Sequence, residues 1–590
     1  MSTPPPLPPP MPTPPPLPTP ALAALATAVR SYEPYLQASG EMTDPVIGSP
    51  TQYGTPYHAF CHAILAAHGP ADARDHHTGA AVRGLDAALR HAADPRLPAT
   101  IASIRRDTGA STAGSHRDFF WPPILKTYRL LAALGHPAAP AFAERIAAVD
   151  ILASFHSRPP SNWAMVWVSG EWLRMRLGLS PTTPAAFDDW LGAFFTGPVL
   201  LERGLYQEPG HPNSYDLFTR YHMADTLMEG YAGAWRPQLE HLMETGLRRS
   251  LAVQLSDGSL ASAHRSTGQT WNLGAQCAYF THVAAFFHTR DPLLARQAEE
   301  AATLAFASFT RWQRPAGPYS PVENLLPPPY RVGYEGYTAD GHYGNLAMGF
   351  LAGAIHHGFT GATPAGTERP ALVHIEGDPT YRALAHHGRY SVHVNALPAP
   401  HYDGFGITDL TFGPGRLLQF ASSVRHLSAP TTFYNLGLAL RTGAGLAEIR
   451  PIAGEPMALI GEIEGAPSGV GLRLRSRAKG MAWTYALEVT VDQAGVRVVE
   501  STPGRVGHAT LLVPYVRDCG AGVTTVVSVE GATVRLQLGA EVVRIEVEGG
   551  IERALDLPYG YENRRGLCGL LRLDIAGACA GIRYRVVVER

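Results

Sequence analysis

Residues 203–225, RGLYQEPGHPNSYDLFTRYHMAD, carry titratable and aromatic side chains on nearly every side of a predicted helix. An ordinary surface helix keeps such groups on one face and gives the other face to apolar residues. Histidine and tyrosine are also side chains that commonly transfer protons in catalysis. The segment therefore either lines an active site or is a polar helix whose histidines make structural hydrogen bonds.

A proline follows His211 and sets where this helix begins. We expect the helix to start just after it, with Asn213 as its cap and Asp216 in the first turn. His211 then lies on the preceding loop, where the positive end of the helix dipole favours a neutral imidazole. Helical spacing puts Tyr215 and Tyr221 on different faces, so the two tyrosines are alternatives.

Four further segments concentrate the same residue types at predicted helix ends and loops: 114–123, 158–172, 257–272 and 334–345. Their candidate site residues are Asn162, Trp163, His264, Arg265, Tyr334, Glu335, Tyr337, Asp340 and His342. Aromatic rings flanked by Arg, Asn and Asp suit sugars, which present apolar faces and many hydroxyl groups. Asn162 is equally a helix cap or a site residue, and the spacing of Trp163, Trp167 and Trp172 favours a core stripe.

The hydrophobic pattern divides the chain into two parts. Between residues 20 and 358, about a dozen segments repeat apolar residues every three or four positions, which predicts helix pairs in a bundle or a closed double ring. The sequence has no repeat of fixed period, which argues against an open solenoid. From about residue 371 the pattern alternates and is rich in Val, Thr and Tyr, which predicts an antiparallel β-sandwich.

These patterns predict four regions. A disordered proline-rich leader occupies 1–20, a helical domain 21–358, a linker 359–370 and a β domain 371–590. The N-terminus does not resemble a secretory signal, and no uncharged apolar run is long enough to span a bilayer. We expect a cytoplasmic protein without a membrane partner, with export by another route left open.

Composition excludes several functions. The net charge is −2, so there is no basic excess that would bind nucleic acid. Only two lysines occur and there is no GxxxxGK loop, which disfavours nucleotide binding and Schiff-base chemistry. The five cysteines form no CxxC pair and favour free thiols, with one Cys568–Cys579 bridge left open.

We expect no cofactor and no metal. HExxH is absent, although 25 histidines leave a metal possible. Three adjacent histidine pairs are weak metal-binding signals: His76–His77, His356–His357 and His386–His387.

An Asn-Trp near a helix start, a His followed by Tyr, and an Arg-containing loop together resemble the (α/α)-toroid polysaccharide lyases of the hyaluronate and chondroitin lyase type. The passages DGS…HRS (257–266) and YEGYTADGHYGNLA (334–347) are more similar to an uncharacterised bacterial family of the same class, related to heparinase-like lyases and certain glucuronidases. The resemblance implies a toroid of about twelve helices, then an antiparallel β-sandwich domain, acting on a polysaccharide or oligosaccharide.

The activity that the resemblance implies is β-elimination next to a uronic acid. The proton α to a carboxylate is very weakly acidic, so another group must bind the carboxylate and stabilise the developing charge. The resemblance gives this role to Asn162, helped by Arg265 or His264. His211 or Tyr221 would take the proton, and one tyrosine of the segment would return a proton to the leaving oxygen.

Two alternatives stay open. A glycoside hydrolase on the same scaffold would use two carboxylates on opposite sides of the bond. Its candidates are Glu208, Asp216, Glu335 and Asp340, and Asp118 is a less favoured fifth candidate. The other alternative is a non-catalytic glycan-binding protein. YQEPGH also departs from the lyase pattern just before the histidine, because it contains Glu208. Sugar identity, linkage and oligomeric state are not predicted.

Overall fold

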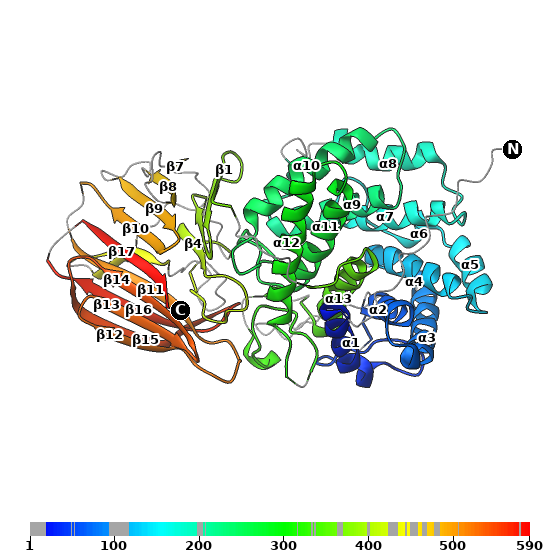
Figure 1. Cartoon of the computed structure of the whole chain (residues 1–590), viewed down its shortest axis with the longest axis horizontal. Coiled ribbons are helices and arrows are strands. Elements are labelled where there is room, and N and C mark those ends of the chain that lie inside the picture. The colour runs from blue at the N-terminus through cyan, green and yellow to red at the C-terminus, as the bar shows by residue number, and fades with distance from the viewer. Residues whose placement is uncertain are drawn as a thin grey trace.

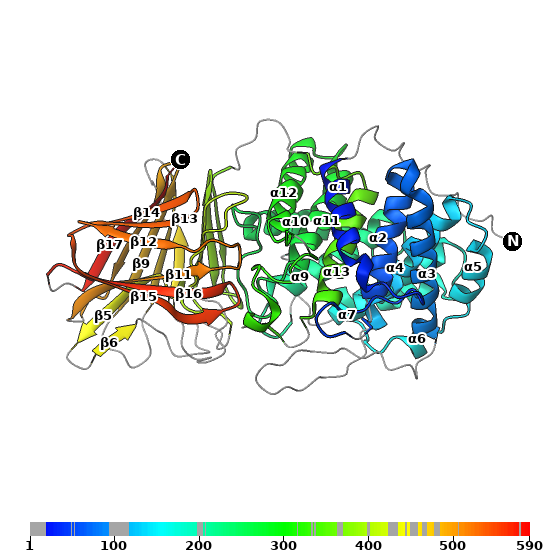
Figure 2. The same cartoon turned by 90° about the horizontal axis from the view of Figure 1, so that it is seen from below.

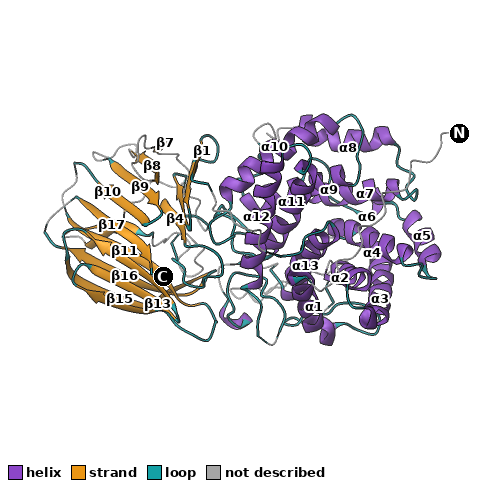
Figure 3. Cartoon of the chain, viewed as in Figure 1, coloured by secondary structure: helices purple, strands orange, loops and turns teal. Residues whose placement is uncertain are grey.

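The computed structural model shows a helical domain followed by a β domain (Figures 1 and 3). The residues that it describes are 19–48, 50–51, 54–93, 117–196, 204–206, 208–315, 317–331, 334–335, 338–362, 370–397, 402–422, 435–442, 445–448, 458–462, 469–476, 484–504, 507–577 and 580–589. Most of the predicted leader, part of the predicted linker, Tyr337 and Cys579 lie outside them. The other four cysteines are free.

Six of the described helices form a closed inner ring. Each one packs against the next, and α13 closes the ring by contacting both α11 and α2. In ring order they are α2 (Gly54–His68), α4 (Trp121–Ala133), α7 (Asn162–Arg176), α9 (Asn213–Met228), α11 (Trp271–Phe287) and α13 (Asp340–His356).

Outer helices cover the ring (Figure 2). They are α1 (Pro20–Tyr32), α3 (Arg74–Ala93), α5 (Ala139–Ala147), α8 (Pro184–Thr196), α10 (Arg236–Val253) and α12 (Pro292–Thr310), and a short α6 (Ile151–Ser154) joins α5 to α7. Short 3₁₀ turns lie at Glu33–Tyr35, Ala71–Ala73, Arg117–Phe119 and Pro328–Tyr330. This double ring confirms the predicted toroid. No helix in the described part of the chain is long and apolar enough to cross a membrane.

Burial separates the two kinds of helix. Every residue of α9 from Asn213 to Leu227 is buried, whereas α12 buries only a stripe that includes Leu294, Ala298 and Ala305. A helix enclosed on all sides has no face in water, so α9 lacks the amphipathic pattern of α12. Close packing also needs small residues: a side chain at Gly274 would collide with the carbonyl of Ala347 on the neighbouring helix.

The β domain contains three antiparallel sheets. The four-stranded sheet is β1 (Leu372–Glu376), β2 (Arg382–His387), β3 (Tyr390–Asn395) and β4 (Gly406–Thr411). The eight-stranded sheet runs β12 (Val526–Glu530), β13 (Thr533–Leu538), β14 (Glu541–Val547), β17 (Gly581–Val588), β10 (Gly495–Ser501), β9 (Tyr485–Asp492), β8 (Gly469–Ser476) and β7 (Ala458–Glu462). The five-stranded sheet runs β15 (Ile551–Asn563), β16 (Gly566–Ile575), β11 (His508–Asp518), β5 (Gly437–Thr442) and β6 (Gly445–Glu448).

The sheets form a sandwich whose second layer is divided. Alternate residues of β9, including Leu487 and Val489, are buried, so the eight-stranded sheet buries one face there. Strands β2 and β3 pack on β9, and β11 packs on β17. The two smaller sheets therefore cover the eight-stranded sheet between them, which confirms the predicted antiparallel β-sandwich.

The toroid covers the other face of the four-stranded sheet. All residues of β3 and β4 are buried, and the backbone N–H of Ser256 donates a hydrogen bond to the hydroxyl of Ser391 (2.8 Å). A strand buried on both faces cannot keep polar groups in water, so each buried polar group needs a partner inside the protein.

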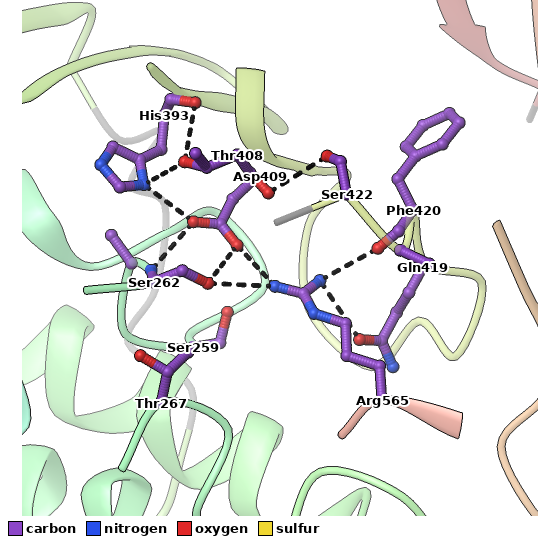
Figure 4. A network of polar contacts seen from close by, with 12 residues as sticks. Ser259, Ser262, Thr267, His393, Thr408, Asp409, Gln419, Phe420, Ser422 and Arg565 are labelled. Atoms are coloured by element: carbon purple, nitrogen blue, oxygen red, sulfur yellow. Dashed lines mark hydrogen bonds and ion pairs between the residues drawn. The ribbon is translucent and has the colours of Figure 1, made fainter. Parts of the chain in front are cut away.

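Asp409 on β4 meets this need at the junction of the two domains (Figure 4). Its carboxylate accepts hydrogen bonds from the Ser262 N–H (2.9 Å) and hydroxyl (2.8 Å) and contacts Nδ1 of His393 (2.9 Å). The guanidinium of Arg565 donates to it as well. Burial alone would raise the pKa of Asp409, but the hydrogen bond from His393 and the charge of Arg565 hold it below its usual range. The carboxylate thus fixes the toroid segment 257–272 to the β domain.

Replacing Asp409 by asparagine is expected to lower the free energy of unfolding by about 3–5 kcal/mol, because Arg565 would remain buried without its counter-ion. Chemical denaturation followed by circular dichroism measures the change. The matched control is Glu488→Gln, which removes an exposed ion pair with Arg473 and should cost at most about 1 kcal/mol. Equal losses in the two variants would contradict this role of Asp409.

Candidate active site

The segments that precede α7, α9 and α11 meet at one end of the ring, on the side of the β domain. Asn162 and Arg265 both contact Glu208, which comes from the segment before α9. The segment before α13 joins them, because the N–H of Ser266 donates to the Glu335 carboxylate (2.9 Å). Helix N-termini carry partial positive charge, so this arrangement favours an anion between them.

Glu208 lies at the centre of the cluster. The side-chain amide of Asn162 and the guanidinium of Arg265 donate to its two carboxylate oxygens. Asn162 is free for this contact because Ser161 is the helix cap and accepts a hydrogen bond from the N–H of Ala164 (3.2 Å). The amide oxygen of Asn162 is buried and has no partner among the described residues. Asn162 and Arg265 thus bind one carboxylate together, and the same two donors are able to bind the carboxylate of a ligand.

Tyr215 belongs to this cluster and Tyr221 does not. The Tyr215 hydroxyl is 3.0 Å from the hydroxyl of Ser266, and the Arg265 guanidinium lies over the Tyr215 ring at 4.5 Å from its centroid. Tyr221 is 3% exposed and packs against Phe350 inside the ring (4.9 Å between centroids). Burial raises the pKa of Tyr221 well above its usual value. Both tyrosines are buried, but of the two only Tyr215 contacts the loop that carries Arg265 among the contacts of the described residues.

His211 lies on the predicted loop but in a strained conformation. Its φ of 47° is uncommon for a residue other than glycine, and its carbonyl accepts a hydrogen bond from Arg382 of β2 (2.9 Å). Burial and the charge of Arg382 lower the pKa of His211, so the ring is neutral at pH 7. Its Nδ1 atom is buried without a partner among the described residues. Backbone strain of this kind often accompanies functional sites.

The expected cap of α9 is wrong. Pro212 holds the cap position, and Asn213 is the first helical residue. The Asn213 amide donates to the carbonyl of Ala261 (2.9 Å), and its oxygen accepts from Arg249 (2.9 Å). Asp216 accepts from Arg249 as well (2.7 Å). The outer helix α10 and the loop that carries Ala261 supply these partners, so the two side chains do not cap their own helix.

His264 lies beside the cluster. Its φ is 60°, and its ring packs on Tyr402 of the β domain at 4.3 Å between centroids. Burial and the charge of Arg265 lower the pKa of His264 to about 4. The ring is therefore neutral at pH 7 and adds no positive charge. A side chain at Gly210 would overlap the His264 ring, so the two loops approach each other because residue 210 is a glycine.

Two predicted carboxylates have structural partners. Glu335 accepts from the Ser266 N–H and from the Gln269 side chain (2.8 Å), which orders the loop that carries Arg265. Asp340 begins α13 and is buried between Arg314 (2.9 Å) and Arg331 (2.7 Å). These ion pairs hold the pKa of Asp340 below its usual value despite burial.

The remaining predicted residues lie around the cluster. Trp163 is half-buried in the first turn of α7, with its ring against Phe119 (5.8 Å between centroids). Tyr334 donates its hydroxyl to the carbonyl of Arg564 and thus contacts the β domain. His342 is buried in the first turn of α13. Trp167 is buried in the core, and Tyr337 lies outside the described residues.

The β domain contributes residues to this end of the ring that the sequence did not reveal. Asp403 accepts a hydrogen bond from the N–H of His264, and Arg382 contacts the backbone of His211. Arg564 is buried, donates to the carbonyl of Thr267, and keeps Nε and Nη2 without partners among the described residues. None of these residues lies in a recognisable motif, so only the folded chain reveals them.

A closed ring of paired helices followed by an antiparallel β domain is the (α/α)-toroid fold of polysaccharide lyases, as the resemblance implied. The chain is similar to a point mutant of the chondroitin AC lyase of Streptomyces coelicolor A3, with a TM-score of 0.51, 11% identity, and coverage of 96% of this chain and 79% of that chain. At this identity the likeness shows the fold alone.

Two other solved structures have lower TM-scores. The heparan sulfate lyase HepC from Pedobacter heparinus has a TM-score of 0.33 at 13% identity, with coverage of 90% of this chain and 92% of that chain. A chondroitinase AC lyase studied with oligosaccharides has a TM-score of 0.44 at 9% identity, with coverage of 96% and 80%. No protein-family profile and no curated protein sequence matched the chain.

Replacing Gly210 by alanine is expected to separate the two loops, because the new methyl group would overlap the His264 ring. The melting temperature should fall further than in Gly135→Ala, which is also at positive φ (70°) but has nothing within 4 Å of the new atom. Both substitutions strain the backbone, so the difference between their melting temperatures reports the effect of the overlap with His264. Equal melting temperatures would show that His264 does not depend on this close approach.

Proposed function

We propose that the protein is a polysaccharide or oligosaccharide lyase that cleaves next to a uronic acid by β-elimination. The observation that carries the proposal is the grip of Asn162 and Arg265 on the carboxylate of Glu208. A uronate carboxylate would take the same amide and guanidinium donors when the Glu208 side chain moves aside. Both groups would then withdraw charge from the sugar as its α-proton leaves.

The surroundings favour a negatively charged substrate. The N-termini of α7 and α9 point to this end of the ring, and their dipoles favour an anion there. The unpartnered guanidinium nitrogens of Arg564 lie on the β-domain side. Trp163, at the start of α7, offers an aromatic face to a sugar ring. These features fit an acidic polysaccharide better than a neutral one.

The proton transfers fall to His211 and Tyr215 in this proposal. His211 is neutral, so it can accept the proton that leaves the carbon α to the carboxylate. The Arg265 guanidinium lies over the Tyr215 ring, and the Tyr215 hydroxyl can return a proton to the leaving oxygen. Tyr221 is enclosed in the ring and takes no part.

Three of the carboxylates that the glycoside hydrolase alternative would use are held by structural partners. That reaction needs one protonated and one free carboxyl group facing the same bond. Asp216 is enclosed by Arg220 and Arg249, and Asp340 by two other arginines. Both oxygens of Glu335 accept hydrogen bonds from the neighbouring loop.

A panel of uronate-containing polysaccharides tests the proposal. A lyase leaves an unsaturated uronate at the new non-reducing end, which is detected by its ultraviolet absorbance. New reducing ends without this absorbance would mean a hydrolase, and binding without any product would mean a glycan-binding protein. Either result would overturn the proposed reaction.

Substitutions separate the proposed roles. His211→Ala and Tyr215→Phe are each expected to reduce kcat by about 10²-fold or more while leaving sugar affinity nearly unchanged, because each would remove one proton transfer. Tyr221→Phe is the matched control and should retain most activity, because that hydroxyl lies inside the ring. Steady-state kinetics on the best substrate of the panel measures all three. An inactive Tyr221→Phe beside an active Tyr215→Phe would reverse the assignment.

The pH profile tests the base. A base must be unprotonated, so activity should fall as the pH drops through the pKa of His211. Burial and Arg382 lower that pKa, so the acid limb of kcat/KM should have its midpoint below the usual histidine value of 6.5. A midpoint above 6.5 would contradict a neutral, half-buried His211 as the base.

A further inference from the structure

Three histidines on α2 and α3 lie close together and take no part in the candidate active site. They are His62 on α2 and His76 and His77 in the first turn of α3. Each offers one ring nitrogen, and these three atoms lie within 4.8 Å of one another. Imidazole nitrogen is a preferred ligand of zinc and related divalent metals.

A chain of hydrogen bonds determines which ring nitrogen of His62 carries the proton and which is left to bind a metal. The Asn345 side chain donates to the carbonyl of Gly341 (2.7 Å), so its oxygen faces Nδ1 of His58 (3.0 Å) and accepts a proton from it. Nε2 of His58 is then an acceptor for the N–H at Nε2 of His62 (3.1 Å). The lone pair of His62 is left on Nδ1, which faces Nδ1 of His77 at 2.9 Å.

This arrangement matches what a bound metal requires. A metal-ligating histidine usually donates its other ring N–H to a fixed acceptor, as His62 does to His58. Ligands at 2.0–2.1 Å around a tetrahedral zinc lie about 3.3 Å apart, close to the His62–His77 spacing of 2.9 Å. His76 is exposed and can turn towards the metal, and its Nε2 is 2.8 Å from the Glu33 carboxylate. That carboxylate offsets part of the metal's charge.

A second cluster of potential ligands lacks this fit. Asp225, His282 and His357 also lie within 4.8 Å of one another. However, both oxygens of Asp225 accept from the ammonium of Lys126 at 2.8 Å. A metal there would face a buried positive charge, so this cluster is a neutralised charge network.

We propose that His62, His76 and His77 form a binding site for a zinc-like divalent cation between α2 and the first turn of α3, with Glu33 beside it. The metal joins the first turn of α3 to α2 and stabilises the folded chain, because binding to the native state alone adds to its stability.

Calorimetric titration of the chelator-treated full chain with Zn²⁺ tests the proposal. The wild type is expected to bind one equivalent and to gain in melting temperature. His76→Ala should weaken binding by at least about 100-fold, since even partners of the ligands contribute 10–100-fold. His76 is exposed at the start of α3, so its replacement leaves the core packing intact.

Two control variants make the result specific. His241→Ala removes an exposed histidine on α10 and should bind like the wild type. His357→Ala removes a member of the second cluster and should also bind like the wild type. Unchanged binding in His76→Ala, or binding lost in His357→Ala, would overturn the proposal, as would a wild type that binds no zinc.

Discussion

Closure of the inner ring is the constraint on which the rest of the structure depends. Once α13 closes the ring against α2, the residues of α9 from Asn213 to Leu227 are buried on every face of the helix. A buried charged group without a partner costs free energy, so the carboxylates of α9 are paired with cationic side chains. Asp225 pairs with Lys126 and His282, and Asp216 with Arg220 and Arg249. The dense polar pattern of α9 therefore has a structural cause along most of its length.

The same pairing of polar groups holds at the end of the ring that faces the β domain. There Asn162 and Arg265 both donate to Glu208, and the proposed function requires a ligand carboxylate to replace it. The β domain keeps this end in place, because Asp409 holds the loop of Arg265 through Ser262. Binding chemistry and domain docking thus act on one segment, 257–272.

Local patterns were enough to predict the two domains and the loop position of His211. They could not predict contacts made across long stretches of chain, such as Asp403 with His264 or Arg565 with Asp409. They also could not choose between Tyr215 and Tyr221. Because α9 is buried on every face, its hydrophobic pattern does not predict which face points towards the site. The caps were ambiguous because Ser161 and Asn162 are adjacent and only the helix register decides between them.

The proposed lyase activity depends on the binding of a substrate carboxylate by Asn162 and Arg265. The most direct measurement is the affinity of the Tyr215→Phe variant, by calorimetry, for a uronate oligosaccharide and for the same oligosaccharide with its carboxylates reduced to alcohols. A hydrogen bond to a charged group contributes about 1.5–3 kcal/mol, so the uronate form should bind at least about tenfold more tightly. Equal affinity for the two forms would contradict the account.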